Sequence, residues 1–329
     1  MTDSLENKPS DTAGVADQIQ VNLKGRNLLR LLDLTPAEFN AILQVAHDQK
    51  KQVCGGILSR PLEGGAVAII LEKPSLRTRA SFEVAVVQLG GHPIVMADGN
   101  SAFSRGESVQ DTVRVLERYV KCIVMRTFEQ QRLFEVAKHV NVPVVNALTD
   151  AFHPCQGLAD ALTMIERKGA LKGLKLAFLG DGSNNMANTY CELAAITGMH
   201  LRVATPKSHK PARDVLDACR TIAMQTGSTF TFADTAEDAV SGADVVITDT
   251  WTSMGDSAED EAAGIFEPYQ VNERLMRHAA PDAIFMHCLP AHRGREVTDE
   301  VMDSPASVVY DEAENRLHVQ RALLSMVVG

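Results

Sequence analysis

The sequence lacks the features that mark several broad classes of protein. No uncharged apolar stretch approaches the roughly 20 residues of a membrane-spanning helix, so we expect no membrane role. Lys and Arg form no cluster with interleaved aromatic residues, and the net charge of −10 produces a field that repels nucleic acid. We therefore expect no nucleic-acid partner, and an anionic substrate must be captured by a local positive site.

Cysteine is sparse and follows no known pattern. The six cysteines form no C-x-x-C pair and follow no secretory signal, so the sequence predicts neither disulfides nor structural zinc and favours a reducing compartment, the cytoplasm. Residues 1–20 hold four acidic residues, one lysine and no apolar run. We expect a disordered polar extension there, and its acidity argues against a mitochondrial transit peptide.

The rest of the chain has the pattern of an α/β protein. Its 329 residues suggest two domains at about 150 residues each. Short β-branched runs alternate with segments of helical period, as in βαβ units around a parallel sheet. We predict two domains, 21–167 and 168–311, each a mostly parallel sheet flanked by helices, with an amphipathic C-terminal helix at 312–327 that packs back on the first domain.

Local periodicity predicts the individual elements. After a strand at 66–71, a helix begins near Ser75, because apolar residues recur from Phe82 to Leu89 at i, i+3, i+4 and i+7. Further predicted strands lie at 120–125, 142–147, 174–179, 201–204, 243–248 and 283–287. Further predicted helices lie at 154–167, 185–198 and 212–225.

The segment Pro-Ser-Leu-Arg-Thr-Arg at 74–79 lies where the first strand meets its helix. Free backbone N–H groups and the helix dipole favour a phosphate at such a position, and Ser75, Arg77 and Thr78 add two hydroxyls and a guanidinium group. The alternative is that Ser75 only caps the helix while the arginines are solvated. Arg126 and His153 follow two other strands, so all these polar groups are expected to converge at the carboxyl edge of one sheet.

In the second half, Gly180 and Gly182 form the start of a G-x-G-x-x-G dinucleotide fingerprint. The third glycine is absent and the next strand ends without a ribose-binding acid, so we do not expect a nicotinamide site. The adjacent Asn184 and Asn185 offer amides suited to a carboxylate or an amine.

Two more polar segments follow strands. Asp249 opens a long loop through Ser-Met-Gly at 253–255, which is either a functional lid or a solvated loop. His-Cys-Leu-Pro at 287–290 ends another strand, and Cys288 is a ligand, a nucleophile or a small buried apolar residue.

Taken in order, these motifs resemble the aspartate/ornithine carbamoyltransferase family, from about Asn22 to the end of the chain. The resemblance rests on the S-x-R-T-R box at 75–79, the H-P-x-Q box at 153–156, the D-x-x-x-S-M-G loop at 249–255 and the H-C-L-P box at 287–290. The last two boxes are typical of the ornithine branch rather than the aspartate branch.

The resemblance implies roles for these residues. The implied carbamoyl phosphate contacts are Ser75, Leu76, Arg77, Thr78, Arg126, His153, Gln156, Cys288, Leu289 and Arg316. The implied ornithine contacts are Asn185, Asp249, Ser253 and Met254. Arg126, His153, Asp249 and Cys288 would act in the reaction itself, and neither a metal nor an organic cofactor would be required.

The implied reaction converts carbamoyl phosphate and L-ornithine into L-citrulline and phosphate, a step of arginine and citrulline metabolism. The neutral δ-amine attacks the carbamoyl carbon, while Arg77, Arg126 and His153 place positive charge and donors at the growing oxyanion. Asp249 and Cys288 would relay the amine proton. The resemblance also implies a homotrimer or a multiple of trimers.

Two positions depart from the family pattern. Leu76 stands where many relatives have threonine, and Ala102 stands where relatives commonly place a glutamine that reaches a neighbouring subunit. Two alternatives to the ornithine activity remain open. One is a carbamoyltransferase for putrescine or an acylated ornithine, and the other is a non-catalytic Rossmann-like binding protein.

Overall fold

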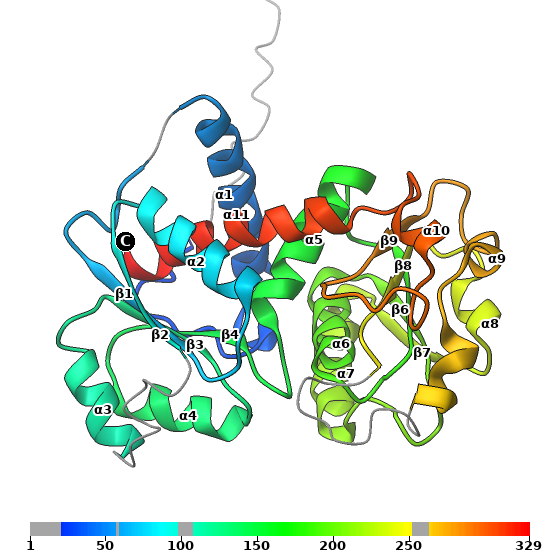
Figure 1. Ribbon diagram of the computed structural model, residues 1–329, viewed down its shortest axis with the longest axis horizontal. Coiled ribbons are helices and arrows are strands. Elements are labelled where there is room, and N and C mark those ends of the chain that lie inside the picture. Colours follow the sequence, from blue (N-terminus) through cyan, green and yellow to red (C-terminus); the bar gives the residue numbers. More distant parts are fainter. Residues whose placement is uncertain (1–20, 57–58, 98–107, 252–262) are drawn as a thin grey trace, which may run out of the picture.

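The computed structural model describes residues 21–56, 59–97, 108–251 and 263–329, which form two lobes (Figure 1). The predicted extension at 1–20, Ala102, Ser253 and Met254 lie outside the described residues. Each lobe contains one sheet, with strand orders β2-β1-β3-β4 and β7-β6-β5-β8-β9, and every strand pairing in both is parallel. The predicted α/β fold is confirmed.

The first lobe is built on a sheet buried on both faces. Alternate residues of its central strand β1 belong to two cores: Val67 and Ile69 join the core formed with α1, α2 and α11, whereas Ala68 and Ile70 join the core formed with α3 and α4. Its strands are β1 (Ala66–Leu71), β2 (His92–Ala97), β3 (Cys122–Arg126) and β4 (Val144–Leu148). Its helices are η1 (Leu31–Asp33), α1 (Pro36–Cys54), α2 (Leu76–Gln88), α3 (Val109–Leu116) and α4 (Gln130–His139).

The second lobe repeats this arrangement. Its central strand β5 is buried from its second residue onward, and β8 is buried throughout. Its strands are β5 (Lys175–Leu179), β6 (His200–Ala204), β7 (Thr229–Ala233), β8 (Val245–Thr248) and β9 (Ile284–Met286). Its helices are α6 (Asn185–Thr197), α7 (Arg213–Thr226), α8 (Ala236–Val240), η3 (Ala263–Tyr269), α9 (Glu273–Met276) and α10 (Asp299–Met302).

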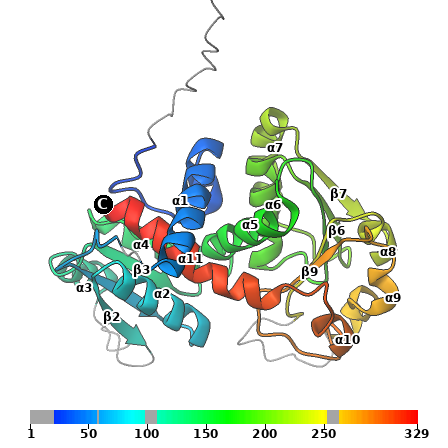
Figure 2. The ribbon, with the colours of Figure 1, turned by 90° about the horizontal axis from the view of Figure 1, so that it is seen from above.

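Two long helices connect the lobes, α5 (Pro154–Lys168) and α11 (Val309–Val328). Figure 2 shows α11 running from the second lobe back across the first, where the chain ends. It packs against α1, α2 and α5 and also contacts β9. The C-terminal helix therefore packs back on the first lobe, as predicted. No helix among the described residues is long and apolar enough to cross a bilayer.

The predicted elements agree with the structure to within three residues at their ends, but the helices α1, α3 and α4 were not predicted, and two strands were missed. These are β2 and β7, which lie at the edges of the two sheets. Pro93 lies in β2, where an edge position tolerates its missing N–H. In β7 no residue is fully buried, so its sequence Thr-Phe-Thr-Phe-Ala lacks the apolar run of a central strand.

Candidate active site

A cleft of about 490 Å³ is lined by residues of both lobes. Its wall is formed by segments that follow β1, β3 and β4 in the first sheet and β5, β8 and β9 in the second, together with one residue of α11. This is the carboxyl edge at which open α/β sheets bind ligands. The residues on this wall that the sequence singled out are Ser75, Arg77, Arg126, His153, Asn184, Asn185, Asp249, Cys288, Leu289 and Arg316.

The turn before α2 combines a helix cap with an open N-terminus. The Ser75 hydroxyl oxygen accepts the backbone N–H of Thr78 at 3.3 Å, and it donates to the Thr78 hydroxyl at 3.0 Å. Ser75 is therefore the N-cap of α2, as the alternative interpretation expected, but Ser75 and Arg77 also lie on the cleft wall. Capping and ligand binding are compatible at this position, because the first N–H groups of the helix remain without intrahelical acceptors.

Three arginines, Arg77, Arg126 and Arg316, meet at the cleft. Arg126 and Arg316 are only 5% and 3% exposed. Among the described residues, no carboxylate forms an ion pair with any of the three, and the Nε atoms of Arg126 and Arg316 have no partner there. Burial and the neighbouring charges of Arg316 and Arg77 lower the pKa of Arg126 to about 10. Buried arginines that form no ion pair with the described residues, such as Arg126 and Arg316, favour an anionic ligand.

His153 lies beside this cluster as a neutral donor. Arg316 Nη1 is 3.3 Å from His153 Nε2, and since a guanidinium can only donate, Nε2 accepts and Nδ1 carries the proton. Burial and the charges of Arg316, Arg126 and Arg77 hold the pKa of His153 well below its usual value. The buried Nδ1 has no partner among the described residues. His153 therefore offers an N–H group rather than the positive charge that the resemblance implied.

Three of the predicted carbamoyl phosphate contacts, Leu76, Thr78 and Gln156, do not line the cleft. Leu76 is 81% exposed, and Thr78 is fully buried, where its hydroxyl accepts from Arg316 Nη2 at 3.0 Å. Gln156 is also fully buried, with its carbonyl oxygen bound to Arg316. Thr78 and Gln156 therefore fix the Arg316 guanidinium through buried hydrogen bonds and do not face the cleft themselves.

The Gln156 amide nitrogen is occupied as well. It donates to Asp160 at 2.8 Å and to Glu312 at 2.9 Å, both fully buried. Burial raises the pKa of Asp160 to about 6 and raises the pKa of Glu312 well above its usual value. In this structure Gln156 therefore uses both ends of its amide in the protein interior and has none free for the carbamoyl amide.

The second lobe contributes one carboxylate and two amides. Asn184 caps α6 through its carbonyl oxygen, which accepts Ala187 N–H at 2.8 Å, and its nitrogen donates to Asp249 at 3.3 Å. Asn185 donates to the backbone oxygen of Thr149 in the first lobe at 2.7 Å. The end of β8 thus places Asp249 next to the N-terminus of α6.

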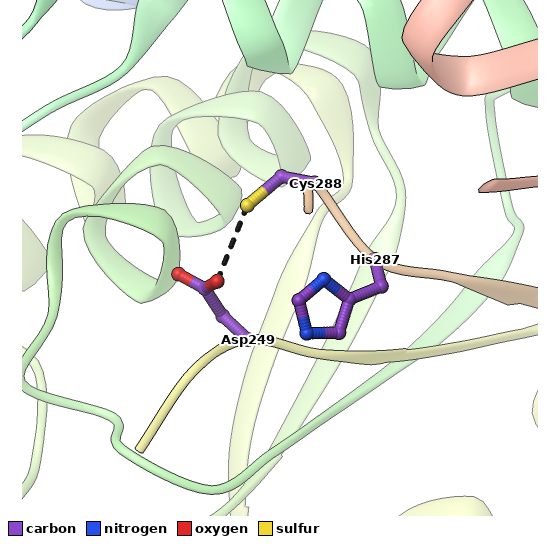
Figure 3. A group of neighbouring side chains, drawn as sticks. All are labelled: Asp249, His287 and Cys288. Carbon is purple, nitrogen blue, oxygen red and sulfur yellow. Dashed lines mark hydrogen bonds between the residues drawn. The ribbon is translucent and has the colours of Figure 1, made fainter. Parts of the chain in front are cut away.

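Figure 3 shows the Cys288 thiol directed toward Asp249, with Sγ 3.2 Å from Oδ1. Burial and the carboxylate of Asp249 raise the pKa of Cys288 well above its usual value, so the sulfur keeps its proton and donates. The sequence alone did not decide whether Cys288 is a ligand, a nucleophile or a small buried apolar residue. The geometry favours a hydrogen-bond donor that orients Asp249.

Asp249, His287 and Cys288 lie close enough together to suggest a metal site. The His287 ring, however, accepts the backbone N–H of Leu289 on Nδ1 at 2.9 Å, and its Nε2 lies 3.3 Å from Glu296. An imidazole bound in this way has no lone pair directed at the thiol, and the thiol itself is protonated. The chemistry of these donors does not fit a metal ion.

The two glycines of the incomplete fingerprint are explained by packing. Gly180 has φ +111, and a Cβ there would lie 3.1 Å from the Trp251 ring. A Cβ on Gly182 would lie 2.6 Å from the backbone oxygen of His209. Both positions require glycine because protein atoms occupy the space, without any dinucleotide.

Several residues of the cleft wall were not predicted. Lys73 is 9% exposed, forms an ion pair with Asp150 and lies 4.4 Å above the Phe128 ring. These three residues follow β1, β4 and β3 by two residues each. Ligands bind at the carboxyl ends of strands, and this rule would have identified the three residues. The sequence interpretation applied it only to residues within known motifs. The others are Leu148, Met186, Thr250, Pro290 and His292.

The fold and the cleft together define a two-domain α/β enzyme. One lobe and α11 present a cationic site for an anionic substrate, and the other lobe presents a carboxylate and amides for a second, polar substrate. Two family models match the chain: the carbamoyl-P binding domain of aspartate/ornithine carbamoyltransferase at 26–166, and the Asp/Orn binding domain at 172–327. The chain belongs to the aspartate/ornithine carbamoyltransferase family, and it is a transferase.

Individual relatives agree with this assignment. The ornithine carbamoyltransferase of Rhodococcus jostii (strain RHA1) is 50% identical over 91% of this chain and 95% of its own length. That of Pyrococcus abyssi (strain GE5 / Orsay) is 47% identical over 94% and 98%. The solved ornithine carbamoyltransferase structure from Pyrococcus furiosus has a TM-score of 0.91 at 46% identity and covers 94% of this chain and 99% of that one. The resemblance inferred from the motifs is confirmed.

Proposed function

We propose that this protein is an ornithine carbamoyltransferase, which transfers the carbamoyl group of carbamoyl phosphate to the δ-amine of L-ornithine. The observation that carries the proposal is the group of three arginines without ion pairs, beside the free N–H of a neutral His153. Such a site suits a phosphoester with an adjacent carbonyl, because the guanidinium groups bind the phosphate while the imidazole donates to the carbonyl oxygen.

We assign one substrate to each unit of the chain. Residues 21–167 with the helix at 312–327 would bind carbamoyl phosphate through Ser75, Arg77, Arg126 and His153. Residues 168–311 would bind ornithine through Asn185 and Asp249, and we extend this set to Ser253 and Met254 by the family resemblance. The family models support this division, since their names assign the two ligands to the same two halves.

The reaction would proceed by direct attack. The δ-nitrogen forms a bond to the carbamoyl carbon, and the bond from that carbon to the phosphate oxygen breaks as the tetrahedral oxyanion collapses. Arg126 and the His153 N–H stabilise the oxyanion, and Arg77 stabilises the departing phosphate. The amine proton leaves with the phosphate, which becomes a stronger base on release. The Cys288 thiol already holds its proton, which disfavours the relay implied by the resemblance.

A parallel product assay tests the proposal. The protein is incubated with carbamoyl phosphate and, separately, ornithine, putrescine, N-acetylornithine and aspartate, and both the ureido product and phosphate are measured. We expect citrulline and phosphate in equal amounts from ornithine and at least tenfold slower turnover of the other amines. A preference for putrescine or N-acetylornithine would refute the ornithine assignment, and no product from any amine would indicate a binding protein.

We also propose a homotrimer, or a multiple of trimers, in the cytoplasm. One face of α2 exposes apolar residues, with Leu76 81%, Val84 43% and Val87 61% exposed, next to the edge strand β2. Such a stripe beside an open sheet edge is typical of a surface that is covered in an oligomer. Light scattering on the purified chain measures the mass, and a monomer at micromolar concentration would contradict the proposal.

A further inference from the structure

One face of α6 contacts the first lobe along most of its length. Asn185, Asn188, Thr189 and Glu192 lie at positions i, i+3, i+4 and i+7 and therefore share that face. Asn188 is 5% exposed, and Thr189 and Glu192 are fully buried. Buried polar groups on a helix face must have partners, and here the partners belong to the other lobe.

The first three of these residues bind the turn that leads from β4 into α5. Asn185 donates to the backbone oxygen of Thr149 at 2.7 Å, and Asn188 donates to that of Ala151 at 3.2 Å. The Thr189 hydroxyl accepts the backbone N–H of His153 at 2.9 Å. Every second residue of the turn, at positions 149, 151 and 153, is thus bound by a side chain of α6 in the other lobe.

Glu192 anchors the same face one turn further along. It forms an ion pair with Arg30, and its other oxygen accepts the backbone N–H of Leu31 at 2.8 Å. The Arg30 guanidinium also lies 4.5 Å above the ring of Phe152, the residue before His153. The ion pair of Glu192 with Arg30 is therefore in direct contact with the turn that carries His153.

His153 is held at both its backbone and its ring. Its backbone N–H precedes α5 and has no helical acceptor, so the Thr189 hydroxyl satisfies it. Its ring accepts from Arg316 of α11. The packing here is tight, because a Cβ on Gly157 would lie 2.9 Å from Thr189 Cγ2. The direction of the free Nδ1–H thus depends on a contact that crosses between the lobes.

We infer that Thr189 is a positioning residue: its hydroxyl holds the His153 backbone across the lobe boundary and so aims the Nδ1–H at the carbonyl oxygen of the anionic substrate. The inference rests on the proposed function. It also links the two substrate sites, because α6 begins with Asn184 and Asn185 on the cleft wall. A ligand held at the start of α6 acts on the helix that sets the position of His153.

Thr189→Val tests this inference, because valine keeps the shape that packs against Gly157 and removes only the hydroxyl. We expect kcat for citrulline formation to fall at least tenfold, since small misplacements of a reacting group cost up to about a hundredfold. The dissociation constant for inorganic phosphate should change less than twofold, because the arginines are untouched. Thr189→Ser, which keeps the hydroxyl, should restore kcat to within threefold of the unchanged protein.

Thr197→Val is the matched control. Its hydroxyl donates to Leu193 O at 2.7 Å, as the Thr189 hydroxyl donates to Asn185 O at 2.6 Å, but among the described residues it forms no hydrogen bond with the first lobe. This variant should keep kcat within twofold. Unchanged kcat in Thr189→Val, equal losses in both valine variants, or no rescue by serine would overturn the inference.

Melting curves of all three variants separate positioning from folding. If Thr189→Val does not fold, Thr189→Ala takes its place in the same comparison. Absence of citrulline formation by the unchanged protein would instead refute the proposed function, so the two failures are distinguishable.

Discussion

At the residue scale, the side chains of the site motifs divide into those on the cleft wall that are free to bind a ligand and those already bound by the protein. Arg77 and Arg126 make no ion pair among the described residues, whereas the Thr78 hydroxyl and both ends of the Gln156 amide are occupied. Adjacent residues of one motif therefore differ in function. The S-x-R-T-R box contributes cleft-wall groups at Ser75 and Arg77 and a structural group at Thr78.

Arg77→Ala should weaken carbamoyl phosphate binding. The change removes a charge-assisted contact of about 1.5–3 kcal/mol, which corresponds to roughly ten- to 150-fold in kcat/KM for that substrate. Arg77 makes no ion pair among the described residues, so the melting temperature should barely change. Arg79→Ala is the control, because Arg79 is exposed on the same helix and pairs with Glu83. Full kcat/KM in the Arg77 variant would show that the phosphate lies elsewhere.

Asp249→Asn should lower kcat/KM for ornithine by about two orders of magnitude, or roughly 3 kcal/mol, because under the proposed function the carboxylate pairs with the α-ammonium of ornithine. Turnover of N-acetylornithine should fall much less, since its acylated α-nitrogen carries no positive charge. Steady-state kinetics on both amines measure the difference. If Asp249 only organises Asn184 and Cys288, both substrates would lose activity equally.

At the element scale, α5 and α11 are joined by a buried polar network in addition to their apolar packing. Each helix contributes a pair four residues apart: Gln156 and Asp160 from α5, and Glu312 and Arg316 from α11. Tyr190 of α6 completes the group by donating to Asp160 at 2.7 Å. Such a network orders the cleft arginine, and it places two buried carboxyl groups next to each other.

This network predicts how stability depends on pH. The pKa of Asp160 is raised to about 6 from 3.8, mainly by burial, so the folded state binds a proton that the unfolded state releases. The resulting stabilisation is complete below pH 3.8 and is lost as pH rises through 6. Asp160→Asn removes this protonation-dependent stabilisation. The free energy of unfolding should therefore fall by about 1 kcal/mol less in the variant than in the unchanged protein when the pH rises from 5 to 8. Urea unfolding at both pH values measures it, and an identical pH slope in the two proteins would contradict the assignment.

At the scale of the whole molecule, the lobes are joined by more than the two connecting helices. Glu192 of the second lobe is fully buried against Arg30 and the backbone of the first, and the adjacent turn carries His153. Since the cleft takes its walls from both lobes, the position of one lobe relative to the other determines the site.

Arg30→Met should therefore destabilise the fold by about 3 kcal/mol, because it leaves a buried carboxylate without its cation. Burial already raises the pKa of Glu192 to about 7, so the variant should bind a proton there and its deficit should be smaller at pH 6 than at pH 8. Arg26→Met is the control: the Arg26 side chain is 44% exposed, so its ion pair with Glu38 is open to solvent on one side and should contribute about 1 kcal/mol or less. Equal effects of the two changes would show that the lobes are not coupled through Glu192.

The elements that the sequence predicted have local signals, whereas the helices α1, α3 and α4 were not predicted. The helix at Ser75 was visible from its cap and its apolar period, and β1, β3 and β8 were visible as β-branched runs buried on both faces. The edge strands β2 and β7 were missed because neither contains a fully buried residue, so each is recognised only through its pairing with a neighbouring strand. Likewise Lys73, Phe128 and Asp150 were missed because each is an ordinary residue until three strand ends are brought together.

The order of the boxes along the chain was enough to identify the family and the residue types that its chemistry needs. Only the tertiary structure decided which of these residues reach the cleft, that His153 is neutral, and that Cys288 donates to Asp249. The physical reason is that charge state and hydrogen-bond partner depend on burial and on groups distant in sequence. Arg316 lies 163 positions from His153, and no local pattern encodes their contact.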